Sequence, residues 1–476
     1  MRIETRHWSR VLTDRDTLLV GAFLALAMFL GSFIAKGQLD RVVLICGGVT
    51  VALAFGWIVR RPYLGLAAFI VYQFAIPTAQ IEDHPILGRL GLLLALATFG
   101  LFAFGRLVSR DRVTITLPKP VEWAGLLFLT GLTLATAING EQHTPAGVSS
   151  WALAGEFYRS ALLSVLFLLT VRSLPALQLL VRILLAASLL YALYGLLPGV
   201  SGVYRGEEGP GRVTGLHHDP NYYAFYLVFP VLLALTYLVR RSGRDRWLSI
   251  AVVAIGGLAI IQTYSRGAWL SVIGGLGYLL LRDRFRWRTL LIGIVVAALV
   301  TGLFGGIIVE RFEGVGDLEA RSNSLVSRLY AANAGWRMFT DHSVAGVGLG
   351  EFKSHVVAYG NAFLHGQMQI GAHNTYVQLL AETGVLGGGA YIVFLLLTLS
   401  GLRRATRKLR SAKSPMASWV LGLEVATVGI FIGMSSLSLG SHYREWIFLS
   451  LAIVALRLVD EWRDAPSEGA PEEVLP

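Results

Sequence analysis

Charged residues are scarce in this chain of 476 residues: Asp, Glu, Lys and Arg together make up 15% of it, whereas hydrophobic residues make up 54%. A soluble protein would carry about 25% charged residues. Apolar runs recur from one end of the chain to the other, and the mean hydropathy is +0.61. The composition therefore excludes an ordinary soluble protein and predicts that lipid surrounds most of the chain.

Cysteine, nucleotide-binding motifs and acidic clusters are scarce as well. The single cysteine, Cys46, cannot form a disulfide within the chain and does not indicate the redox compartment. A GxxxxGK[ST] loop is absent, which argues against an ATP-driven pump. One acidic triplet, Asp317-Leu-Glu319, is weak evidence for a metal site, so we expect no metal and no cofactor. The net charge of +11 does not indicate nucleic-acid binding, because the basic residues fall in short clusters between apolar runs.

The apolar runs predict an all-α fold, a polytopic membrane bundle of about 12–14 transmembrane helices. A membrane-spanning helix needs about 20 apolar residues. The first run, 17–35, is too long for a signal peptide and lacks a clear cleavage site, so we expect it to be retained. The candidate spans are 17–35, 42–59, 63–80, 86–105, 121–138, 152–171, 176–198, 220–239, 247–263, 267–281, 289–308, 375–400, 416–438 and 445–459.

The distribution of lysine and arginine predicts the orientation of the bundle. With the N-terminus inside, most basic clusters fall on the cytoplasmic side, and both termini are cytoplasmic. We expect a first membrane part at 1–308 with about 11 spans and a last part at 373–463 with about three. The segment 309–372 is predicted to be a periplasmic insertion, and 464–476 a disordered cytoplasmic tail.

The insertion is predicted to contain a helix from Ser324 to Asp341. Its apolar stripe recurs at helical spacing and consists of Leu325, Leu329, Ala332 and Trp336. This amphipathic helix is expected to lie along the membrane surface or to form a structural lid. The glycines at 346, 348 and 350 predict a tight turn after it.

His373 and Asn374 lie where this polar segment meets an apolar run, and Gly384 and Gly387 follow at a short distance. A histidine at that edge is suited to act as a general base, with Asn374 as a positioning or capping group. The alternative is an interfacial histidine that precedes a helix capped by Asn374. The two glycines predict close packing between helices.

Four arginines are candidates for contact with an anion. Arg212 precedes a predicted helix start near the membrane edge and suits a phosphate, because its guanidinium offers bidentate donors; the alternative is a solvated loop residue. Arg266 interrupts two apolar runs, where an arginine is costly unless it is paired or hydrated. Arg328 and Arg337 are nine residues apart on one helix and point in nearly opposite directions, so at most one is expected to face His373.

From about Arg212 to Gly389 these pieces, in this order, resemble the core of the O-antigen ligase and polymerase family. The matching pieces are Gly-Arg212-Val-Thr-Gly, Pro220-Asn221 at the start of a span, Ser265-Arg266-Gly267, the Trp336 helix with its glycine turn, and His373-Asn374-x9-Gly384-x-x-Gly387. The resemblance implies a GT-C type, metal-independent, inverting glycosyltransferase in the bacterial inner membrane with its active site on the periplasmic face.

The same resemblance implies partners and residue roles. The donor would be a glycan on undecaprenyl diphosphate, and the acceptor would be lipid A-core or another glycan; membrane lipids surround the protein and nucleic acid plays no part. His373 would be the base, with Arg266 and Arg212 as catalytic cations. The residues expected to bind the diphosphate or the glycan are Arg328, Arg337, Asn374, His218 and Asn221.

Several alternatives stay open at this stage. Within the family, the protein would be a ligase, a polymerase that joins one lipid-linked repeat to another, or a relative that glycosylates protein. A flippase or secondary transporter is a different class, which the predicted span count and the Glu156/Arg159 pair would suit. A transporter should show paired halves with helices broken at the midplane, and the sequence shows no convincing repeat.

Overall fold

The computed structural model describes residues 61–75, 90–109, 119–197, 202–204, 212–215, 219–240, 244–282, 327–360, 371–414 and 416–464. These residues form an all-α membrane bundle, as predicted, in which seven helical stretches are long and apolar enough to cross a membrane. The predicted spans at 17–35, 42–59 and 289–308 lie outside the described residues, as does 465–476 of the tail.

The first half of the described chain is a series of apolar helices whose starts carry recognisable signals. Ser149 and Ser173 accept the backbone amides of Ala152 and Ala176, which satisfies donors that the first helical turn leaves without an intrahelical partner. The helices are α3 (Tyr63–Ala75), α5 (Leu90–Ser109), α6 (Pro120–Asn139), α7 (Ser150–Thr170) and α8 (Leu174–Leu196).

A short antiparallel hairpin of β1 (Gly202–Tyr204) and β2 (Arg212–Gly215) separates α8 from the next group of helices. That group comprises α9 (Pro220–Arg240), α10 (Arg244–Ala251), the π-helical turn η1 (Val252–Gly256), α11 (Gly257–Gln262) and α12 (Arg266–Arg282). The last group comprises α15 (Ser327–Asp341), α16 (Phe352–Tyr359), α17 (Thr375–Gly384), the π-helical turn η3 (Val385–Gly389), α18 (Ala390–Ser411), α19 (Met416–Met434) and α20 (Tyr443–Asp464).

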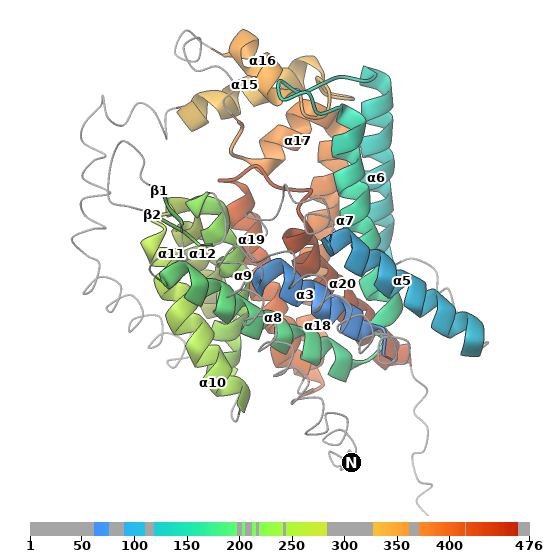
Figure 1. Cartoon of the computed structure of the whole chain (residues 1–476), viewed down its shortest axis with the longest axis vertical. Coiled ribbons are helices and arrows are strands. Elements are labelled where there is room, and N and C mark those ends of the chain that lie inside the picture. Colours follow the sequence, from blue (N-terminus) through green and yellow to red (C-terminus); the bar gives the residue numbers. More distant parts are fainter. Residues whose placement is uncertain are drawn as a thin grey trace, which may run out of the picture.

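Helices α9 and α19 form the interior of the bundle. The protein buries 83% of the apolar stretch of α9 and 78% of that of α19, compared with 28% of Asp245–Gln262. Phe229 of α9 stacks on Phe448 of α20 with the ring centroids 4.3 Å apart. Figure 1 shows α15 and α16 at one end of the molecule, above α17, with α10 at the opposite end.

A polar network joins three helices at the end of α12 that is remote from Arg266. Glu424 of α19 is fully buried, and its carboxylate accepts from Nε of Arg282 at 2.7 Å and from the hydroxyl of Tyr278. Arg403 of α18 donates to the same tyrosine oxygen at 2.8 Å, and Arg410 donates to the carbonyl oxygen of Arg282 at 2.8 Å. The basic end of α18 therefore lies beside the end of α12.

The helix predicted in the insertion exists as α15, but its buried face is not the predicted apolar stripe. The buried residues are Ser327, Ala331, Ala334, Gly335 and Met338. Leu329 and Trp336 are instead 63% and 54% exposed. Small residues face inward because α17 approaches α15 closely: a Cβ on Gly335 would lie 2.5 Å from a methyl carbon of Val377.

Candidate functional site

Arg212 opens strand β2 and joins separate segments at one corner of the bundle. Its Nε donates to the carbonyl oxygen of Thr263 at 2.8 Å, and its Nη2 donates to Oδ1 of Asn221 at 2.9 Å. The backbone amide of Asn221 donates to Oδ1 of Asp219 at 2.6 Å, a local turn that favours a helix start. Because Thr263 lies just before Arg266, Arg212 holds the starts of α9 and α12 beside each other.

Arg266 and Arg328 approach the same corner from two other helices. Arg266 is the first residue of α12, Arg328 is the second residue of α15, and both are half-buried. Burial lowers the pKa of Arg328, the charge of Arg266 lowers it further, and the charge of Asp219 raises it. Charges influence one another in this way only when they lie close together. Helix α15 therefore delivers one arginine to the corner that Arg212 builds.

His373 belongs to the same group of side chains. It lies two residues before α17, is half-buried, and has a left-handed backbone with φ 46°. Burial lowers the pKa of its imidazole, Arg328 lowers it further, Asp219 raises it, and Lys353 lowers it. A lowered pKa keeps the imidazole neutral at physiological pH, which is the form that can accept a proton.

Asn374 caps α17, so its side-chain oxygen is engaged in holding the helix start. Oδ1 accepts the backbone amides of Tyr376 and Val377, each at 3.1 Å. The capping role considered from the sequence is thus present in the structure. Its assignment to substrate binding stays a prediction.

Thr375 anchors the start of α17 to the loop between α19 and α20. The side chain is fully buried, and its hydroxyl donates to the carbonyl oxygen of Leu437 at 2.7 Å. The same oxygen accepts the backbone amide of Leu439 at 2.9 Å. Since His373 is only two residues away, this anchor limits where the imidazole can lie.

The α19–α20 loop, residues 435–442, also touches the helices that carry the other site residues. The hydroxyl of Tyr222, next to Asn221, donates to the carbonyl oxygen of Ser438 at 2.7 Å. A Cβ on Gly267, next to Arg266, would lie 2.2 Å from the hydroxyl oxygen of Ser436. This loop therefore forms a common floor for the starts of α9, α12 and α17, a role that sequence reasoning missed.

Two ionisable residues at the end of this floor were also missed. His442 is exposed, and its ring lies edge to face with that of Tyr222, with the ring centroids 5.9 Å apart. Arg444 is 6% exposed and its Nε donates to the carbonyl oxygen of Gln73 at 2.8 Å. Its guanidinium also lies over the ring of Tyr226, 4.8 Å from the centroid. The only sequence signal for the floor loop was its serines, which lie between two apolar runs. The local sequence does not indicate which residues those serines contact.

The glycine of the motif after Asn374 breaks a helix. Gly384 ends α17 with φ 59°, and a Cβ there would lie 2.3 Å from the carbonyl oxygen of Val344. The predicted role of Gly384 in helix–helix packing is therefore wrong, because the partner is the loop 343–348. Backbone groups that the break leaves without a helical partner form hydrogen bonds with that loop. The amides of Val347 and Gly348 donate to the carbonyl oxygens of Ala381 and Glu382 at 2.9 and 3.0 Å, respectively. In the other direction, the amides of Val385 and Leu386 donate to the carbonyl oxygens of Ser343 and Val344 at 2.8 and 3.2 Å.

The predicted glycine turn is confirmed and explains this pairing. Gly346, Gly348 and Gly350 all have positive φ, which other residues rarely adopt. Glu382 adds a side-chain contact, because its Oε1 accepts the backbone amide of Phe352 at 3.3 Å and so attaches α16 to α17.

The remaining predicted residues lie elsewhere. Arg337 lines a separate cavity with Tyr359 on the exposed side of α15, as the spacing from Arg328 predicts. His218 lies outside the described residues. The Glu156/Arg159 pair is formed on α7, and both side chains are partly exposed. Among the described residues, no group of three or more His, Cys, Asp or Glu side chains is arranged to hold a metal ion.

Residues 251–392 match the family model described as O-antigen ligase. The chain carries an O-antigen ligase domain. This match is consistent with the O-antigen ligase and polymerase family that the motifs resemble. No curated protein matches the chain.

The O-antigen ligase domain contains most of the site but not all of it. Arg266, Arg328 and His373 lie inside the matched residues, together with the broken helix at Gly384. Arg212 precedes the match, and the floor loop 435–442 follows it. The candidate site therefore combines residues of the matched domain with segments from both sides of it.

Proposed function

We propose that this protein transfers a glycan from undecaprenyl diphosphate to an acceptor hydroxyl on the periplasmic side of the bacterial inner membrane, as an O-antigen ligase. The observation that carries the proposal is the grouping of the half-buried His373 with Arg328, which in turn lies close to Arg266. A neutral base next to fixed cations suits a reaction in which a hydroxyl loses a proton and a diphosphate leaves.

In the proposed reaction, His373 accepts the proton of the acceptor hydroxyl as its oxygen attacks the anomeric carbon of the donor sugar. The bond from that carbon to the diphosphate oxygen breaks, and its electron pair leaves with the undecaprenyl diphosphate. Attack from the opposite face inverts the anomeric centre. Arg266 and Arg328 stabilise the charge that develops on the leaving group, because fixed donors in a partly buried site need little reorganisation.

Arg212 has a positioning role in this proposal. Its two described hydrogen bonds hold Asn221 and Thr263, and thereby the start of α12. The basic end of α18 and the Arg282–Glu424 network lie at the other end of α12. The positive-inside rule assigns that basic end to the cytoplasm, which supports a periplasmic location for the site.

The test is transfer by purified protein in proteoliposomes with a lipid-linked donor. His373→Ala should lower the rate by about 10²–10⁴-fold, and Arg266→Gln by about 10²–10³-fold. Arg404→Ala, at an exposed position on the basic end of α18, should transfer at the parental rate. Normal transfer by His373→Ala, with the protein present in the membrane at normal amount, would remove the base from the mechanism.

Gene deletion followed by a gel of surface polysaccharide separates the related functions. Long unattached chains indicate a ligase, and products with a single repeat indicate a polymerase. Loss of all external material with intact cytoplasmic intermediates indicates a flippase and contradicts the proposed reaction.

A further inference from the structure

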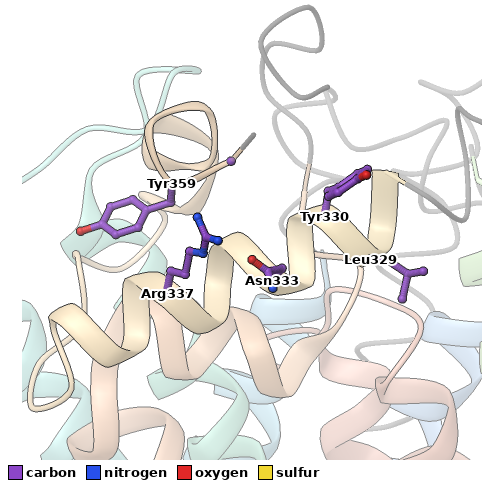
Figure 2. Close-up of a pocket in the computed structure, with 6 residues that line it drawn as sticks. Leu329, Tyr330, Asn333, Arg337 and Tyr359 are labelled. Atoms are coloured by element: carbon purple, nitrogen blue, oxygen red, sulfur yellow. The ribbon is translucent and has the colours of Figure 1, made fainter. Parts of the chain in front are cut away.

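A cavity lies between α15 and α16. It has a volume of about 360 Å³ and is lined by Leu329, Tyr330, Asn333, Arg337, Tyr359 and Gly360. Figure 2 shows Arg337 extending from α15 toward Tyr359 of α16, with Asn333 and Tyr330 further along α15. The volume of this cavity falls within the range of small-ligand pockets in proteins.

The cavity is distinct from the group around His373. Arg328 and Arg337 are nine residues apart on α15, which is two and a half helical turns, so they leave the helix on nearly opposite sides. Arg328 is influenced by Arg266 and Asp219, whereas Arg337 lines the cavity. Helix α15 thus presents the guanidinium of Arg328 to the group around His373 and that of Arg337 to the cavity.

Arg337 has features of a ligand-binding arginine. It is exposed, and among the described residues no carboxylate forms an ion pair with it. The backbone oxygen of Arg337 accepts a hydrogen bond from the hydroxyl of Thr340 at 2.8 Å. That hydrogen bond does not involve the guanidinium. A guanidinium so placed can form two parallel hydrogen bonds to a carboxylate.

The other lining residues suit a sugar. Tyrosine combines an apolar ring face with a polar hydroxyl, and a sugar ring likewise has apolar C–H faces and polar edges. Tyr330 and Tyr359 therefore match both aspects, while the Asn333 amide can donate to and accept from hydroxyls. The hydroxyl of Tyr359 lies 3.2 Å from Nε2 of His342, and the side chain of Asp341 is hydrogen-bonded to the same tyrosine, so both hold the ring at the cavity edge.

We propose that this cavity is a glycan subsite that holds a sugar unit carrying a carboxylate, remote from the bond that reacts. This inference rests on the proposed function, because it assigns the cavity to the glycan substrate. The carboxylate pairs with Arg337, the ring face packs against Tyr359 or Tyr330, and the hydroxyls bond to Asn333. Binding there extends recognition beyond the reacting sugar and leaves the chemistry to His373.

The competing occupant is an anionic lipid headgroup, since Leu329 and Trp336 of α15 are exposed. Two phenols and an amide beside the arginine favour a ligand rich in hydroxyl groups over a phosphate alone. The lipid is therefore an outcome of the test.

Binding is measured with the full chain in nanodiscs of neutral lipid, probed on an array of acidic and neutral oligosaccharides. Oligosaccharides with a hexuronic acid should bind more tightly than neutral ones. Arg337→Ala and Tyr359→Ala should each weaken that binding about tenfold or more, and Arg337→Lys should weaken it less. Arg404→Ala is the matched control and should bind as the parent does. A preference for neutral sugars, no binding of acidic ones, or full binding by Arg337→Ala would overturn the proposal.

Two further measurements separate the possible failures. His373→Ala should keep saccharide binding while it loses transfer; if transfer persists but Arg337→Ala loses binding, the proposed base is wrong and the subsite stands. The parent protein could instead fail to bind acidic oligosaccharides, while Arg337→Ala weakens the binding of anionic lipid in nanodiscs. In that case the cavity binds lipid headgroups and the proposed glycan subsite is wrong.

Discussion

At the scale of single residues, two of the three described non-glycine residues with positive φ lie at or beside the proposed site residues, and the third is Lys413. His373 and Tyr264 have φ values of 46° and 53°, a conformation that costs about 1–3 kcal/mol for a residue other than glycine. Tyr264 lies two residues before Arg266, and His373 carries the proposed base. Thr375 and the floor loop supply the contacts that hold this geometry.

The electrostatic surroundings of His373 predict how the reaction depends on pH. Lys353 is exposed on α16 and lowers the pKa of His373. The neutral imidazole is the reactive form, so a lower pKa extends activity toward acid. Lys353→Met removes this charge and raises the pKa, and the acid limb of the rate profile should therefore move to higher pH.

The measurement is the rate of transfer in proteoliposomes across a pH series. Lys353→Arg keeps the charge and should leave the acid limb where it is in the parent. An acid limb that stays in place, or moves to lower pH, in Lys353→Met would show that another group controls it.

At the scale of elements, the α17 start depends on one hydroxyl that bonds to the floor loop. Thr375→Val keeps the shape but leaves the carbonyl of Leu437 and the amide of Leu439 without this buried partner, which costs about 1–3 kcal/mol. We expect a lower transfer rate with little change in the apparent affinity for the donor, because the change moves the base more than the phosphate site.

Thr375→Ser retains the hydroxyl and should restore most of the rate. Thermal unfolding of the detergent-solubilised variants gives the stability change. Equal rates for Thr375→Val and Thr375→Ser would rule out a positioning role for this hydroxyl.

The break between α17 and η3 predicts a second effect on stability. Gly384→Ala places a Cβ at positive φ and against the Val344 carbonyl, and the backbone strain alone costs about 1–3 kcal/mol. Gly277 of α12 has open space around it, so Gly277→Ala should be neutral or stabilise by up to about 1 kcal/mol. The comparison of their unfolding temperatures tests this, and equal values would contradict the proposed strain.

At the scale of the whole molecule, the two ends of the bundle differ in chemistry. One end carries His373 and the three arginines, and the other carries the Arg282–Glu424 network with the basic end of α18. The proposed orientation makes a topological prediction that needs no enzyme assay. In a Cys46→Ser background, Thr340→Cys on α15 should react with a membrane-impermeant maleimide in spheroplasts, and Arg404→Cys on α18 should not.

After the membrane is permeabilised, both cysteines should react, because both positions are exposed. The reverse labelling pattern in spheroplasts would place the site on the cytoplasmic face and would contradict a periplasmic donor.

The sequence by itself determined the fold class and several of the described helices, and its motifs indicated the O-antigen ligase domain. Apolar runs long enough to span lipid can satisfy their backbone groups only as helices or closed barrels, so α6 to α9 could be predicted nearly to the residue. The motif glycines at 346, 348 and 350 predicted a turn because positive φ is a local property. The opposite directions of Arg328 and Arg337 followed from helical geometry alone.

Tertiary structure decided which residues meet. The floor loop 435–442 is far along the chain from Tyr222 and Gly267, and no local pattern records those contacts. The exposed stripe of α15 was likewise decided by packing, because close approach to α17 selects small residues over large apolar ones at the interface. Local propensities act over a few residues, whereas the site is assembled from helix starts that only the folded bundle brings together.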